Sequence, residues 1–507
     1  MKKKILSLLM VGAMSASMLM GCGGGSTDTN SEVSSEIDMD EEAYECSIQV
    51  VILPGMDYSA QESAMEEALN ELTKPAINCT VDIQFVSIAE VANTTQMQIA
   101  ADEKIDLVHV ATVSPISAMV GQDLLLDLTD LLEKRGQDIK ALYDESILAA
   151  GMVDDQLLAI PAKQYNVSGK GIYYNKTVAD ANGITVPESG TIDDLEAVLT
   201  QVAEKTDIMP FYVGEGKTNY LYWLSSYNSF GDQAAYGAII DEIDGNATIE
   251  NLYASDEFEE FCLRMYKWRQ AGILQKNQED TNQAQTYFNE GQLFAVVTDI
   301  TPALKAQYQA QAQASGFEAE FMTLVEPAVT NSVVQEYMWG IAANSERPEK
   351  AMDLLNYLYS ADGAAAANIL LYGLEGENYE KVEGSENVIA TNGSYLASFM
   401  VIGDQSKIAV QAPNDDTFVQ QNEDMMASAK VSNLIGYMYT ANDFSAEAGA
   451  VSNVIVEYLP RLQNGVCESE EATKALIDEF NSALESAGIN EIIADNQAHM
   501  DEFIANK

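Results

Sequence analysis

The residue types that most enzyme mechanisms need are scarce in this chain of 507 residues. Its two histidines are His109, within the apolar run DLVHVA, and His499, in an acidic stretch near the C-terminus. A Ser-His-Asp triad would have to use one of them, and the sequence contains no G-x-S-x-G, H-E-x-x-H, P-loop or dinucleotide fingerprint. We therefore expect no catalytic residue, no metal and no cofactor, and we expect His109 to be buried structure. Glycoside hydrolysis by two carboxylates is the alternative, because such a pair has no local motif.

Side chains suited to binding are more abundant. The sequence has 24 Tyr, 14 Phe and 3 Trp, and the segment NYLYWLSSYN groups Tyr220, Tyr222 and Trp223. Flat aromatic rings can stack on the C–H face of a ligand, although aromatic residues also dominate protein cores. Both interpretations stay open for each ring of this segment, whereas Trp268, on a helix face, is expected to pack in the core.

Strands and helices alternate along the first part of the chain. The runs CSIQVVIL (46–53), CTVDIQFV (79–86) and IDLVHVA (105–111) read as buried strands, with helical stretches at 61–72 and 88–101 between them. This order predicts a parallel sheet with right-handed crossovers, and ligands of such sheets bind beyond the carboxyl ends of the strands. A second α/β unit is expected from about residue 169, with a strand at 293–300 and helices that include 192–205, which Thr191 would cap, and 258–271.

The N-terminus has the pattern of a secretory signal peptide. Lys2, Lys3 and Lys4 precede an apolar run that is too short for a membrane span, and the run ends in LMGC at Cys22. This ending resembles the bacterial lipobox, in which the cysteine carries the lipid; an ordinary signal peptide with a chance cysteine is the alternative. The Gly-, Ser- and acid-rich stretch up to residue 45 predicts a flexible tether.

Charge and cysteines narrow the possible partners. The formal net charge of −53 argues against binding to nucleic acid or to anionic lipid headgroups. The length favours two lobes, and 47% hydrophobic residues are ordinary for a globular protein. The sequence has no C-x-x-C, which argues against a zinc or thioredoxin-like site. We expect Cys46, Cys79, Cys262 and Cys467 to be buried thiols. A Cys46–Cys79 bridge is the alternative if their strands are neighbours.

Three stretches resemble the extracellular solute-binding proteins (family 1) of carbohydrate ABC transporters. They are IYYNKTVADANGITVP followed by TIDDLEAVLTQVAEK (172–205), the strand at 294–300, and WGIAANSERPEKAMDLLNYLYSADGAAAANILLYGLEGENYE (339–380). In the first, Asn182 stands where the family usually has Ala. The third is the most specific and is similar to a lipoprotein subgroup with an extra C-terminal module, which the region from Leu459 also resembles.

The resemblance implies a two-lobed α/β fold of the periplasmic-binding-protein type (type II). Each lobe would be a mainly parallel sheet flanked by helices, with a ligand cleft between the lobes and hinge closure as the working motion. Crossovers are expected near 161–169, 310–321 and 372–378. The implied division is a signal peptide at 1–21, an acylated Cys and tether at 22–45, an N-terminal lobe at 46–165 plus 316–373, and a C-terminal lobe at 166–315 plus 374–507 that includes the extra helical module.

The same resemblance implies that the protein captures a sugar or oligosaccharide and delivers it to an ABC permease. It would do so as a monomer that its lipid holds on the outer face of the cell membrane. Ligand stacking would then fall to Tyr220 and Trp223 on the rim of the second lobe and to Trp339 near a crossover, with core packing as the alternative. Carboxylates and amides pair with sugar hydroxyls. The candidates are Asp57 after the first strand, Gln164 at the first crossover and Asp299 at a strand end, all chosen by position alone.

Overall fold

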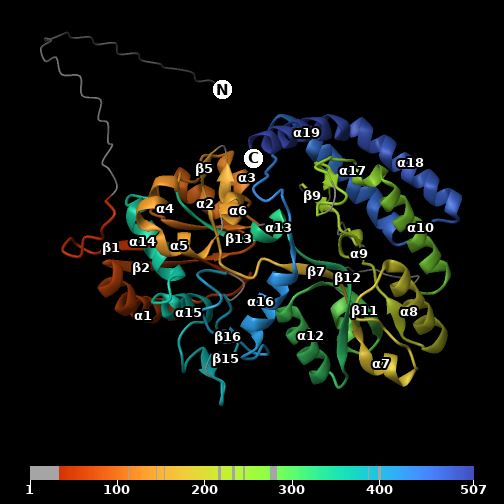
Figure 1. The fold of residues 1–507 in the computed structure, drawn as a ribbon, viewed down its shortest axis with the longest axis horizontal. Helices are drawn as coiled ribbons and strands as arrows, with labels where there is room; N and C mark the ends of the chain where they lie inside the picture. Colours follow the sequence, from red (N-terminus) through yellow and green to blue (C-terminus); the bar gives the residue numbers. More distant parts are fainter. Residues whose placement is uncertain are drawn as a thin grey trace, which may run out of the picture.

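The computed structural model describes residues 34–111, 113–143, 145–153, 155–214, 219–230, 234–243, 246–274, 283–385, 387–397 and 401–507. Within these ranges the chain forms two α/β lobes, each with its own sheet and its own hydrophobic core (Figure 1). Among the described helices, none has the length and apolar character that crossing a membrane requires.

The sheet of the N-terminal lobe has the strand order β2-β1-β3-β13-β6. As predicted, β1 (Tyr44–Ile52) pairs in parallel with β2 (Cys79–Ser87) and β3 (Leu107–Ala111), and the crossovers are α1 (Ser59–Ile77) and α2 (Val91–Ala100). In contrast, β13 (Tyr337–Ile341) runs antiparallel to both β3 and β6 (Ile160–Pro161). The helices that pack around α1 or against one another in this lobe are α4 (Thr129–Arg135), α5 (Gln137–Leu142), α14 (Pro348–Tyr359) and α15 (Ala364–Tyr372).

The sheet of the C-terminal lobe has the order β17-β12-β7-β11-β8. Its central strand β7 (Ser168–Asn175) is antiparallel to β11 (Leu293–Ile300) and to β12 (Ala319–Val329). The edge strands β8 (Met209–Phe211) and β17 (Lys430–Val431) pair in parallel with their neighbours. The two-lobed α/β class is as expected, but both sheets are mixed rather than mainly parallel, because β13 in the first sheet and β7 in the second run opposite to the other strands of their sheets.

Helices of the C-terminal lobe begin where the sequence predicts. The 14 residues of α8 (Ile192–Lys205) follow Thr191, whose side chain accepts a hydrogen bond from the Asp194 amide, while the Asp194 carboxylate accepts one from the Thr191 amide. The other helices and short elements are α7 (Lys176–Ala181), α9 (Leu221–Leu224), β9 (Asn228–Ser229), β10 (Ala238–Ile239), α10 (Asp256–Gln270), α11 (Ala284–Asn289) and α12 (Pro302–Ala314).

Three segments connect the lobes, and two of them lie elsewhere than expected. The first lies at 162–167, within the predicted range. The second lies at 330–336 and contains α13 (Asn331–Val334); the third lies at 412–429 and contains α16 (Phe418–Ser428). The crossovers expected at 310–321 and 372–378 are wrong, because β12 belongs to the C-terminal sheet and Tyr372 and Ile389 lie in the N-terminal core.

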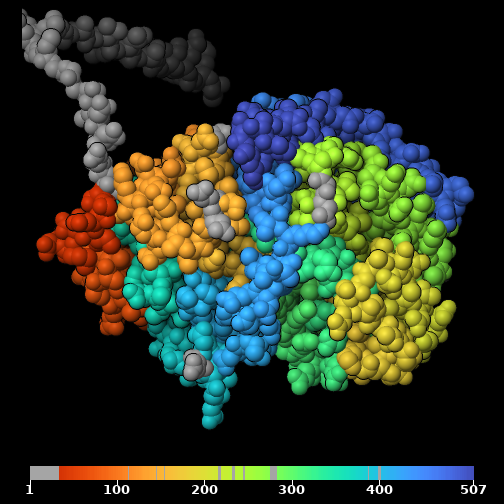
Figure 2. All heavy atoms as spheres, viewed as in Figure 1, coloured from red at the N-terminus to blue at the C-terminus, as the bar shows by residue number. Residues whose placement is uncertain are grey.

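The lobe boundaries change accordingly. Residues 316–329 belong to the C-terminal lobe, and residues 374–411, with β14 (Tyr379–Lys381), β15 (Val388–Thr391) and β16 (Val410–Gln411), belong to the N-terminal lobe. In Figure 2, atoms of the 400–440 region fill the front of the boundary between the two halves.

Three long helices end the chain, as the resemblance implies. They are α17 (Ser445–Gln463), α18 (Glu470–Ala487) and α19 (Ile489–Asn506), and they pack on one another and on α10. Gly488 links α18 to α19 with φ +100°, a conformation that other residues rarely adopt. Figure 1 shows that the module covers the outer side of the C-terminal lobe and that α19 reaches back toward the lobe boundary.

The residues before β1 are docked on the N-terminal lobe, although residues up to 45 were expected to be tether. The Asn78 side chain donates to the backbone oxygens of Asp38 and Glu41, both at 3.0 Å. The Glu41 carboxylate lies 2.9 Å from the Nζ of Lys350, which is fully buried, and 3.2 Å from the guanidinium of Arg347. A tether can therefore extend only as far as about residue 35. Cys22 lies outside the described residues.

The four cysteines of the described residues are free thiols. Cys46 and Cys79 do lie on the neighbouring strands β1 and β2, and both are buried without a bridge between them.

Candidate functional site

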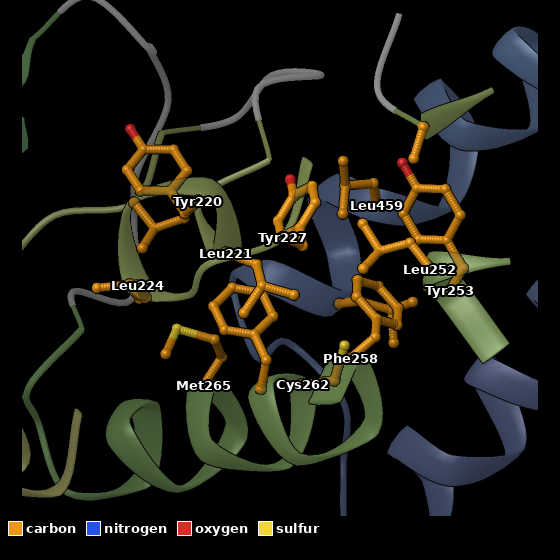
Figure 3. Packing of buried hydrophobic residues seen from close by; sticks show 14 of the residues in the cluster. Tyr220, Leu221, Leu224, Tyr227, Leu252, Tyr253, Phe258, Cys262, Met265 and Leu459 are labelled. Carbon is orange, nitrogen blue, oxygen red and sulfur yellow. The ribbon is translucent and has the colours of Figure 1, made fainter. Parts of the chain in front are cut away.

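Tyr220 belongs to the core of the C-terminal lobe. Its side chain is 7% exposed, and its Oη accepts a hydrogen bond of 3.0 Å from the Gly214 amide. Figure 3 shows Tyr220 beside Leu221, Leu224 and Tyr227, above the helix that carries Met265. The core interpretation therefore applies to Tyr220, and its ring does not form a ligand surface.

Trp339 is likewise a core residue. Its side chain is fully buried in the N-terminal lobe, its ring meets His109 edge-on at 5.5 Å between centroids, and its Nε1 donates to the Val401 carbonyl at 2.9 Å. The expectation that Trp339 stacks on a ligand is not supported, because β13 lies inside the sheet and directs this side chain into the core. Trp268, 1% exposed on α10, packs on Phe211 as expected.

Asp57 and Gln164 are not brought together with the other candidates. Asp57 is exposed before α1, where its Oδ1 accepts from the Ser59 amide at 3.0 Å; these bonds hold the pKa of its carboxyl below the usual value. Gln164 is half-buried on the first connection, and its backbone N–H donates to the Ala162 carbonyl. A ligand role for these two residues stays a prediction from their position at a strand end and a crossover.

Trp223 and Asp299, in contrast, meet at the end of the C-terminal sheet. Asp299 is the penultimate residue of β11, and Trp223 lies on α9, which packs on β7, β11 and β12. Trp223 Nε1 is outside normal hydrogen-bond geometry, yet it is near enough to Asp299 for its N–H dipole to favour the carboxylate. Both residues were separate candidates from the sequence, and both side chains are half-buried.

Three further charged residues surround this pair, and we call Lys170, Glu242, Asp299 and Glu336 the charged cluster. Lys170 lies opposite Asp299 in the pairing of β7 with β11, and its Nζ is 3.7 Å from the centroid of the Tyr222 ring. Glu242 follows β10 and is 3% exposed. Glu336 directly precedes β13 of the N-terminal sheet, at the end of the second connection, so the charged cluster lies where the C-terminal lobe meets that connection.

Burial shifts the titration of every member. It lowers the pKa of Lys170 to about 8, against the attraction of Asp299 and Glu242. It raises the pKa of Asp299, where Lys170, Trp223 and Ser168 oppose the shift, and that of Glu336, where the charge of Asp299 adds to it. It also raises the pKa of Glu242, against the side chain of Ser432 and the backbone of Asn331. Charges removed from water in this way favour a partner that can hydrogen-bond to them.

Among the described residues, Glu242 Oε1, Trp223 Nε1 and Ser225 Oγ are buried polar atoms without a hydrogen bond of normal geometry to the protein. Carboxylate acceptors, an ammonium donor and the faces of Tyr222 and Trp223 together suit a ligand with many hydroxyl groups and an apolar face.

Sequence reasoning did not name Lys170, Glu242 or Glu336 as candidates and left Tyr222 open between ligand stacking and packing. A signal existed for Lys170, a basic residue inside the strand SGKGIYYN of a chain with only 26 Lys and Arg. Glu336 stands three residues before the most specific landmark, which begins at Trp339. No sequence signal pointed to Glu242, because the position of its loop depends on contacts with residues far away in the sequence.

Two hollows of about 480 and 680 Å³ lie between α12 and α16 and share Pro302, Lys305 and Gln421. None of the six predicted binding residues lines either hollow. Among the described residues, no group of three or more His, Cys, Asp or Glu side chains could hold a metal ion.

The comparison with known families agrees with this geometry. The model of the bacterial extracellular solute-binding protein family matches residues 57–365, more than half of the chain. The chain belongs to this family. A domain of unknown function (DUF3502) matches residues 433–505 of the solute-binding protein, which include α17, α18 and α19.

Relatives of this solute-binding protein extend along most of its length. A carbohydrate ABC transporter substrate-binding protein of Streptococcus pneumoniae serotype 4 is 23% identical over 447 residues, 86% of this chain and 87% of the relative. The crystal structure of the N-glycan transport solute-binding protein NgtS of Streptococcus pneumoniae is 20% identical and covers 91% of this chain and 99% of that one, with a TM-score of 0.76. An extracellular solute-binding protein of Bifidobacterium longum subsp. infantis, 14% identical with a TM-score of 0.63, covers 92% and 99%. These structures share the two-lobed fold.

Proposed function

We propose that this solute-binding protein captures a sugar or oligosaccharide outside the membrane and delivers it to an ABC permease by closure of its two lobes. The observation that carries the proposal is the charged cluster, in which the C-terminal lobe and the connection that leads into β13 place charged groups beside the half-buried rings of Tyr222 and Trp223. The name of the pneumococcal relative, a carbohydrate ABC transporter substrate-binding protein, supports a sugar as the ligand. Structures of NgtS in complex with Man5GlcNAc and Man1GlcNAc support the same choice.

Within this proposal the ligand contacts are Trp223 and Asp299 from the sequence prediction, with Lys170, Tyr222, Glu242 and Glu336 added from the structure. The protein binds without turnover, acts as a monomer and is held at the membrane by a lipid on Cys22. Closure would bring Glu336, which precedes a strand of the N-terminal sheet, against a ligand seated on Asp299 and Trp223 of the C-terminal lobe.

A thermal-shift screen of the protein without its first 33 residues tests the ligand class. We expect at least one neutral mono- or oligosaccharide to raise the melting temperature in a concentration-dependent manner, because a ligand that binds only the folded state stabilises it. Man5GlcNAc, Man1GlcNAc, maltose and fructo-oligosaccharides form the first panel, and amino acids and dipeptides are the comparison. A shift with dipeptides alone would contradict the proposal. Release of reducing sugar by the purified protein, abolished by Asp299→Asn, would favour a hydrolase instead.

The lipid anchor is tested separately. We expect Cys22→Ser to abolish incorporation of a labelled fatty acid and to leave the protein uncleaved or released into the medium. Continued fatty-acid labelling of the Cys22→Ser protein would show that the anchor lies elsewhere.

A further inference from the structure

The loop that carries Glu242 is held at both of its ends by one helix of the C-terminal module. Asn496 on α19 donates from Nδ2 to the Tyr236 carbonyl at 2.6 Å, just before β10. Gln497, the next residue, accepts from the Ile249 amide at 2.7 Å and donates to the Ala247 carbonyl at 3.1 Å, on the far side of the loop. The base of the loop is closed by backbone bonds in both directions between Ala238 and Glu250.

The same helix also holds the segment that lies against Glu242 from the other side. The hydroxyl of Tyr437 donates to the Asn496 backbone oxygen at 2.9 Å and also to the Asn496 side chain, and Lys507 Nζ donates to the Asn433 carbonyl. Tyr437 is tied in turn to Asn331, whose Nδ2 donates to its carbonyl at 2.6 Å. Asn331 and Ser432 are two of the groups that favour the charged form of Glu242, together with Lys170 and Asn228.

Asn496 is fully buried, and its amide is bonded to both the loop and the Tyr437 segment. Aromatic contacts reinforce the arrangement: Phe230 and Phe503 meet the Tyr437 ring edge-on at 5.3 and 5.4 Å, and Tyr236 meets Tyr439 at 5.7 Å. Asn496 and Gln497 of α19 therefore bond to backbone groups of the loop that carries Glu242, and Asn496 also accepts from the Tyr437 hydroxyl.

We propose that the C-terminal module builds one wall of the ligand site, with Asn496 and Gln497 of α19 as positioning residues that hold Glu242 in place. This rests on the proposed function for the identity of the ligand, and it gives the domain of unknown function a role in specificity. The loop has little secondary structure of its own, so amide contacts supply the order that a strand would otherwise supply.

The experiment compares Gln497→Ala, Gln497→Glu and Glu242→Gln with Glu502→Ala as a control on the exposed face of α19. The ligand probe is the sugar of the panel above that shifts the parent most, and affinity is measured by calorimetry. We expect Gln497→Ala and Glu242→Gln each to weaken binding roughly tenfold or more, since a displacement of about 1 Å is enough to spoil a binding site. Gln497→Glu keeps the acceptor for Ile249 and should lose less. If Gln497 acts through Glu242, the double variant Gln497→Ala/Glu242→Gln should bind little worse than either single variant.

Hydrogen exchange in the free protein provides a readout that needs no sugar. The Ala238 amide is bonded to Glu250 and not to α19, and we expect it to exchange faster in Gln497→Ala than in the parent or in Glu502→Ala. If no sugar binds the parent, the proposed function fails, while this exchange still decides whether α19 orders the loop. Unchanged Ala238 exchange, or affinity within twofold of the parent in Gln497→Ala, would overturn the inference.

Discussion

At the scale of single residues, the three tryptophans show how one side-chain type serves two purposes. Trp268 and Trp339 are buried in the cores of different lobes, whereas Trp223 is half-buried beside Asp299. A ring that keeps one face accessible can contribute to affinity, and a fully enclosed ring contributes to stability. The consequences of removing each ring therefore differ in kind.

We expect Trp223→Ala to weaken sugar binding by about 1–3 kcal/mol while the folded protein melts near the parent temperature. Trp339→Ala should instead lower the free energy of unfolding by about 3–5 kcal/mol, because it leaves a cavity and an unpaired Val401 carbonyl. Calorimetric binding and thermal melting on both variants separate the two effects. Normal binding by folded Trp223→Ala would remove this ring from the site.

His109 should make the protein sensitive to acid. Its ring is 1% exposed and neither nitrogen has a hydrogen-bond partner, so burial lowers its pKa from 6.5 to about 4. Between these values the unfolded chain binds a proton that the folded protein does not, and stability falls as the pH drops from 6.5 toward 4. The full difference amounts to roughly 3 kcal/mol.

The measurement compares urea unfolding of the parent and of His109→Leu at pH 7 and pH 4.5. We expect the variant to lose less stability on acidification than the parent does. The same change at the exposed His499 is the matched control. An equal acid loss in parent and His109→Leu would mean that His109 does not drive the response.

At the scale of elements, local patterns predicted secondary structure well and lobe membership poorly. The bounds of α8 and β11 and the three parallel strands of the first sheet follow from periodicity and capping residues such as Thr191. Nothing within 316–329 distinguishes a strand of one lobe from a strand of the other, because β12 is assigned by its pairing with β7. The crossovers were misplaced for this reason.

The candidate site was predictable where a residue sits at the end of its own strand, as Asp299 does, or in an aromatic segment, as Trp223 does. Glu242 could not be predicted, since its position depends on Asn496 and Gln497 near the opposite end of the chain. Trp339 was misjudged because the position of its strand within the sheet, flanked on both sides by β3 and β6, cannot be read from the strand alone.

The docked segment before β1 should contribute measurably to stability. Glu41→Ala removes the carboxylate 2.9 Å from Lys350 Nζ, which is fully buried and would be left without that partner. We expect a loss of about 1–2 kcal/mol in the free energy of unfolding. Glu42→Ala, one residue further along and exposed, should change stability little. Equal unfolding curves for the two variants would show that the docking is energetically unimportant.

At the scale of the whole molecule, the net charge should select among sugars. The chain carries 79 Asp and Glu against 26 Lys and Arg, and the charged cluster itself has three acids and one lysine. We expect an oligosaccharide that bears a carboxylate to bind more weakly than its neutral counterpart. The difference should shrink between about 10 mM and 0.5 M salt, since ions screen the long-range part of the repulsion. Titration of a sialylated and an unsialylated form of the best neutral ligand checks this; equal affinities at low salt would contradict it.

The order of strands in the N-terminal sheet also determines when this sheet can form completely during synthesis. Strand β13, which separates β3 from β6, is made only after β7, β8, β11 and β12 of the other lobe have left the ribosome. Until then the first sheet consists of β2, β1 and β3 with an unpaired edge at β3 and no neighbour for β6. An open edge of this kind can pair with another chain, so nascent molecules depend on being kept apart during synthesis. The half of the protein that is synthesised first therefore cannot complete its sheet until most strands of the other half have been made.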